Sequence, residues 1–228
     1  MRPEAPETAP RPSLSTPRAA GLAGILFAVL MAAAIVLARI GLPEGGGASE
    51  VEVTPGQRDA VTTALELVPF AGIAFLWFMG ALREHSGEAE DRFVATVFLG
   101  SGLVFVASLF GAAAAAGTVL GSDQPQEFGR HFAYDLLTTY GMRMAAVFVF
   151  ATSTIGRRLG AFPRPLAMAG YLAGLVLLVA GSSLPWSELV FPAWALVVSL
   201  YILNSGRVRG RPRTAPSGAA AHHSDGGT

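Results

Sequence analysis

Long apolar runs separated by short polar segments are the feature that most constrains this chain. Residues 19–40 are apolar almost throughout, and at 1.5 Å per residue about 20 such positions cross the hydrocarbon core of a bilayer. Only 14% of the residues are charged, against about a quarter in typical soluble domains. The pattern predicts an all-α polytopic membrane protein, a six-helix transmembrane bundle. Its other spans are expected at residues 60–82, 93–120, 135–155, 165–182 and 186–204.

Two polar tails flank this membrane domain, which covers residues 19–204. Residues 1–18 hold five prolines and a single leucine, and residues 205–228 hold four arginines followed by small and polar residues. Neither segment has enough apolar side chains to bury a core, so we predict two disordered tails. Residues 19–40 are interpreted as an uncleaved signal anchor, although small residues near Ala32 leave a cleaved signal peptide open.

The placement of arginine predicts the orientation. Twelve arginines lie in the two tails or in the segments 83–92 and 157–164, whereas only Arg39, Arg58 and Arg130 fall on the other side of the predicted membrane. Segments rich in arginine face the cytoplasm. Both termini are therefore expected in the cytoplasm.

Composition excludes several kinds of chemistry. There is no cysteine, hence no disulfide, thiolate metal site, iron–sulfur cluster or cysteine nucleophile, and the sixteen basic residues are all arginine, hence no Schiff base. A formal net charge of zero gives no basic field to recruit nucleic acid. Neither H-E-x-x-H nor G-x-S-x-G is present, and no cofactor is expected.

Small residues at helical spacing mark two faces where backbones could approach closely. We interpret them as seams for helix packing inside the bundle, with a homodimer seam as the alternative. They are Gly24, Ala28 and Ala32 on the first span and Gly170, Gly174 and Gly181 on the fifth.

Glu66 and Arg143 are ionisable residues inside predicted spans, where charges are rare enough to indicate function by default. Their predicted depths below the outer boundary agree within one helical turn, so we expect them to pair. A snorkelling side chain and a solute or proton path remain alternatives. Polar residues on the same two helix faces could line a pocket open to the outside: Asp59, Thr62, Thr63, Asp135 and Thr139.

A weak metal pattern lies just before the fourth span. Glu127, His131 and Asp135 follow one another at steps of four, which would align two carboxylates and an imidazole on one helix face. Structural zinc sites are usually richer in histidine or cysteine, so solvated loop charge is the alternative.

Residues 68–106, 140–158 and 186–203 together resemble a family of uncharacterised six-span membrane proteins of high-GC bacteria. The resemblance covers most of the membrane domain. It implies a six-span topology and an inner-membrane location, and it carries over no catalytic or binding residue.

The expected function is non-enzymatic: a small transporter-like or solute-binding bundle, or an accessory subunit of a membrane complex. The alternative is a membrane-embedded enzyme with an outer-surface metal site. Expected partners are the lipid bilayer and either other membrane proteins or a second copy. A water-filled cavity reaching the two intramembrane charges would favour transport, whereas a tightly packed, dry interior with a large exposed apolar seam would favour the subunit.

Overall fold

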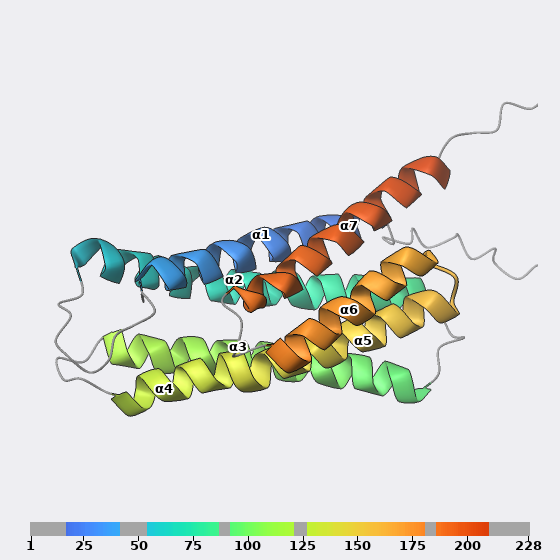
Figure 1. Cartoon of the computed structure of the whole chain (residues 1–228). Helices are drawn as coiled ribbons and strands as arrows, with labels where there is room; N and C mark the ends of the chain where they lie inside the picture. The colour runs from blue at the N-terminus through green and yellow to red at the C-terminus, as the bar shows by residue number, and fades with distance from the viewer. Residues whose placement is uncertain (1–16, 42–53, 87–91, 121–126, 181–185, 210–228) are drawn as a thin grey trace, which may run out of the picture.

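The computed structural model describes residues 17–41, 54–86, 92–120, 127–180 and 186–209, and every regular element in them is a helix (Figure 1). The all-α prediction is therefore confirmed for these residues. The predicted tails are too long at the helix ends, because residues 17–18 belong to the first helix and residues 205–209 to the last; the remainder of both tails lies outside the described residues. The elements are α1 (Pro17–Gly41), α2 (Pro55–Ser86), α3 (Arg92–Leu120), α4 (Glu127–Asp135), the π-helix η1 (Leu136–Gly141), α5 (Met142–Arg158), α6 (Arg164–Ala180), the 3₁₀-helix η2 (Ser187–Leu189) and α7 (Val190–Arg209).

The helices lie lengthwise in an up-and-down bundle, and α1 begins at the same end at which α7 finishes (Figure 1). Helix α1 packs between α2 and α7, α3 packs against α2 and α5, and α6 packs against α5. Elements α4, η1 and α5 follow without a break, so this helix starts at Glu127, eight residues before the start expected from the sequence. In this first part of the helix Phe128 and Phe132, four residues apart, stack on one helix face with their ring centroids 6.0 Å apart.

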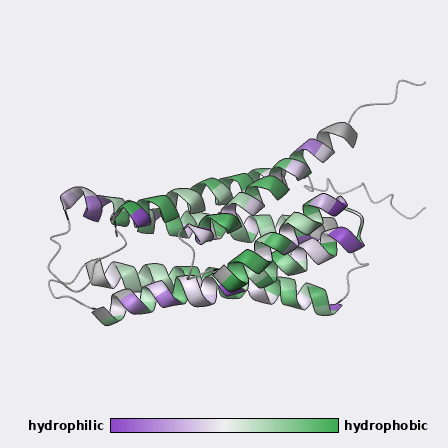
Figure 2. Ribbon diagram, in the orientation of Figure 1, coloured by the Kyte–Doolittle hydropathy of each residue, from purple (hydrophilic) through white to green (hydrophobic). Residues whose placement is uncertain are grey.

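Within the described residues, five helical segments are long and apolar enough to cross a membrane, namely residues 19–41, 55–83, 92–118, 131–158 and 187–205. Hydrophobic residues dominate the middle of the helices, and hydrophilic residues gather towards their ends (Figure 2). Helix α6 is apolar but has 17 residues, about 25 Å at 1.5 Å per residue, which is shorter than a hydrocarbon core of about 30 Å. The described chain thus has the helices of a multi-pass membrane protein.

Phenylalanine fills the centre of the bundle. Five fully buried rings, one each from α1, α2, α3, α5 and α7, make eight ring contacts with centroids 4.9 to 6.4 Å apart, mostly edge to face. Tilted and edge-to-face pairs are favourable beyond the area they bury, because the positive ring edge meets the negative ring face. The rings that tie the helices together are Phe27, Phe75, Phe105, Phe148 and Phe191.

Small residues let the helices approach these rings. A Cβ at Gly24 would collide with the Ser199 hydroxyl of α7 and would lie 2.6 Å from the Phe78 ring of α2. A Cβ at Gly170 would collide with Ser153 of α5, and one at Gly174 would lie 3.0 Å from the Phe150 ring. Ala28 is buried and Ala32 half-buried, while Gly181 lies outside the described residues.

Candidate functional site

A buried ion pair joins the first and last long helices. Nη2 of Arg39, in the last turn of α1, donates to both carboxylate oxygens of Glu188 in η2, at 2.9 Å to Oε1 and 3.0 Å to Oε2. The side chain of Arg39 is 17% exposed and that of Glu188 is 7% exposed. Charges this deep are stable only when they are paired, so each side chain holds the other in place.

The ends of the helices favour both charges. Arg39 stands at the carboxyl end of α1, where the helix dipole attracts a cation. Glu188 stands at the start of the η2–α7 segment, where the helix dipole attracts an anion. Trp186 adopts a left-handed backbone conformation with φ of 69°, and its carbonyl accepts a 3.0 Å hydrogen bond from the Leu189 N–H. This turn brings the Trp186 ring to 5.6 Å from Cζ of Arg39, a cation–π distance. The guanidinium thus contacts a carboxylate and an indole from the same turn.

Sequence reasoning missed this pair. Its members are 149 residues apart, and from the sequence Arg39 enters only the arginine pattern that predicts the orientation. One signal was present, because Glu188 is the only acidic residue between Asp135 and Asp225. An acid retained in such a long stretch at the start of an apolar helix indicates a buried partner.

The structure places Glu66 and Arg143 on outward faces. Both residues are exposed, and Nη1 of Arg143 donates a 2.9 Å hydrogen bond to the carbonyl of Thr139 in its own helix. Helix α2 packs against α1 and α3, whereas α5 packs against α6 and α3. Among the described residues no ion pair joins Glu66 to Arg143, so the pairing expected within one bundle is not formed.

The structure does not gather the expected pocket residues into one site. Asp59, Thr62, Thr63 and Asp135 are exposed, and Thr139 is half-buried. The Thr62 hydroxyl donates to the Arg58 carbonyl of its own helix at 2.9 Å instead of pointing into a cavity. A hollow that the structure does record lies elsewhere, on α7, lined by Leu200, Tyr201, Leu203 and Asn204.

The metal pattern falls on α4, where His131 and Asp135 are both exposed; nothing is described of the Glu127 side chain. Within the ranges that the structure describes, no three histidine, aspartate or glutamate residues stand close enough to hold a metal ion. The arrangement with defined geometry is thus a clamp: a buried Arg–Glu pair that fixes the carboxyl end of α1 to the start of α7. Comparison with known proteins finds no matching family, no matching curated protein and no matching solved structure.

Proposed function

We propose that this chain is a six-span protein of a bacterial inner membrane, with both termini in the cytoplasm. Arg83, Arg157 and Arg164 stand where α2 ends, α5 ends and α6 begins, and these helix ends lie together at one end of the bundle (Figure 1). Arg39 and Arg58 stand near the opposite helix ends. The excess of arginine at one end supports a cytoplasmic location for that end. The resemblance noted above supports membership of the six-span family of high-GC bacteria.

We further propose that the bundle is an accessory subunit that packs beside other membrane proteins. The observation that carries this proposal is the closed interior, in which five phenylalanine rings from five helices meet at the centre. A solute or proton path requires polar or charged groups facing a wet interior. Here the two intramembrane charges face outwards, and aromatic rings fill the axis instead.

The buried polar groups support the same conclusion. Most buried hydroxyls bond to carbonyls of their own helix: Ser101 to Val97, Thr138 to Tyr134, Thr152 to Phe148 and Ser199 to Ala195. Hydroxyls satisfied in this way do not form a relay across the bundle. Ser153 differs from these four, because its Oγ is buried where α6 crosses α5 at Gly170 and has no hydrogen-bond partner among the described residues. The outer surface, in contrast, exposes large side chains along α2 and α6.

A native-membrane pulldown in mild detergent tests the proposal. We expect the tagged chain to retain a stable membrane-protein companion, identified by mass spectrometry, in amounts comparable to its own. A tagged, unrelated six-span protein expressed at the same level is the control. A chain that purifies alone, and that after reconstitution carries a solute or protons across vesicles, contradicts the accessory role and favours transport.

A further inference from the structure

Two opposite charges lie at similar depth on the outside of the bundle. Glu66 is exposed on the outward face of α2, which it shares with Phe70, Ile73 and Trp77, whose exposed fractions are 63%, 51% and 72%. Glu66 lies seventeen residues before Arg83, and Arg143 lies fourteen residues before Arg157. Arg83 and Arg157 stand at the same end of the bundle, so they give a common reference level. At 1.5 Å per residue, the two depths differ by about 4.5 Å, less than one helical turn.

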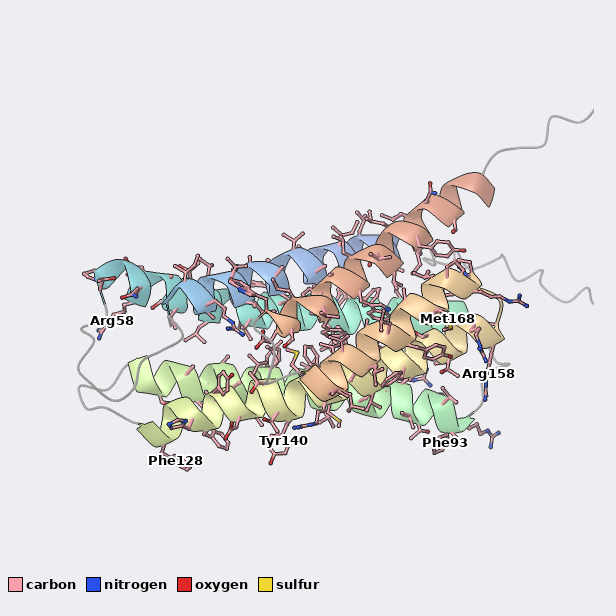
Figure 3. All side chains as sticks on the ribbon, in the orientation of Figure 1. Arg58, Phe93, Phe128, Tyr140, Arg158 and Met168 are labelled. Carbon is pink, nitrogen blue, oxygen red and sulfur yellow. The ribbon has the colours of Figure 1, made fainter. Side chains whose placement is uncertain are left out.

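Arg143 is uncovered because α6 is short. Positions 143, 147, 150 and 154 share one face of α5 by helical spacing. Helix α6 covers this face at Thr154, whose hydroxyl lies 3.2 Å from that of Tyr171, and at Phe150, opposite Gly174. The two helices run in opposite directions, and Gly174 lies opposite Phe150. Because α6 ends at Ala180, six residues after Gly174, it stops about level with Met144, six residues before Phe150. Beyond that level Arg143 and Tyr140 are exposed, and Tyr140 projects away from the bundle (Figure 3).

Neither charge is neutralised within its own bundle. A guanidinium has five N–H donors, and the contact recorded for that of Arg143 is one hydrogen bond to a carbonyl of its own helix. No partner of the Glu66 carboxylate is recorded among the described residues. Charges that face hydrocarbon are costly, so each side chain requires an external partner or must reach the headgroups.

We propose that Glu66 of one copy pairs with Arg143 of a second copy, whose α5 receives the outward face of α2 where Arg143 and Tyr140 are exposed. A lipid phosphate could neutralise Arg143 but would repel Glu66, whereas one contact between copies neutralises both. The two charges lie on different helices, so each contact joins α2 of one copy to α5 of the other. The inference rests on the accessory role proposed above and adds that one neighbour of the chain is the chain itself.

The absence of cysteine allows a direct cross-linking test. Two versions with different tags are co-expressed in membranes, one with Phe70→Cys and the other with Tyr140→Cys, and are treated with a short bifunctional thiol reagent. These exposed positions lie about one helical turn from Glu66 and Arg143, so both charges stay in place. We expect a product that carries both tags. Phe70→Cys with Leu172→Cys is the matched control, since Leu172 is 63% exposed on α6, and we expect no such product from it. No product from the first pair, or equal products from both pairs, overturns the proposal.

Charge reversal provides a second test. Glu66→Arg alone or Arg143→Glu alone should raise the dissociation constant between copies by about tenfold or more, as losing about 1.4 kcal/mol does. A chain that carries both reversals should recover association, measured by counting subunits in single-molecule photobleaching. Loss without recovery, together with release of bound anionic lipid from Arg143→Glu, assigns Arg143 to a headgroup and overturns the pair. If cross-links fail while the pulldown retains a different companion, the pairing is wrong and the accessory role stands.

Discussion

The Arg39–Glu188 clamp provides the sharpest stability prediction. Arg39→Met keeps much of the stem volume and removes the charge, which leaves a carboxylate that is only 7% exposed without its 2.9 Å partner. Removing one partner of a buried ion pair costs about 3 to 5 kcal/mol, because the remaining charge stays desolvated. We expect Arg39→Met to lower the free energy of unfolding by about that amount. Glu188→Gln should cost less, because Arg39 is more exposed and keeps its contact with the Trp186 ring.

A double-mutant cycle separates the clamp from unrelated packing effects. With both charges replaced, as Arg39→Met with Glu188→Leu, no orphaned charge remains, and a large part of the loss should be recovered. Unfolding is followed by fluorescence in mixed micelles with increasing SDS. Arg58→Met is the control, an exposed arginine near the same end of the bundle, and should change stability by less than about 0.5 kcal/mol. Losses that simply add in the double variant would refute the pair as the source of stability.

Three further outcomes follow from the packing and the arginine pattern. Phe75→Ala should lower the free energy of unfolding by about 3 to 5 kcal/mol in the same assay, because the Phe75 ring contacts four others and the bundle cannot collapse around the cavity. A loss below about 1 kcal/mol would contradict a tightly packed aromatic centre. Gly24→Leu should lower the free energy of unfolding by at least about 1 to 3 kcal/mol through overpacking. Gly80→Ala, with open space around it, should not destabilise the bundle, and equal effects of the two changes would contradict the close packing of α1 at Gly24. Reporter fusions in 83–92 and 157–164 should report cytoplasm and those in 41–59 the outside, and one inverted loop would break the six-span topology.

The positions of the helices could be predicted because they depend on local properties. An apolar run of about 20 residues fixes a helix by length alone, and polar breaks such as 83–92 fix its ends. The small residues Gly24 and Gly170 could be recognised in the same way, since only small side chains permit such close approach. Depth along each helix was also predictable, because it follows from counting residues.

The direction in which each side chain points around its helix could not be predicted. Glu66 and Arg143 have similar depths, but whether they face each other depends on which helices are neighbours, and the sequence does not specify that. The clamp between Arg39 and Glu188 depends on the same long-range choice, since its members are 149 residues apart. A count of apolar residues also detects neither the π-helix η1 nor the polar first turns of α4, because both are helical without being apolar throughout.

Water accessibility of the interior tests the central claim most directly. In the cysteine-free chain, single Ala71→Cys, Ala146→Cys and Ala195→Cys substitutions place small thiols at fully buried positions on α2, α5 and α7. Membranes are treated from each side with a charged, membrane-impermeant thiol reagent, and exposed Asp59→Cys provides the positive control. The account predicts labelling of Asp59→Cys and none at the three buried positions from either side. Labelling of the buried thiols at a rate comparable to the control would reveal a water-filled path and contradict the closed, accessory bundle.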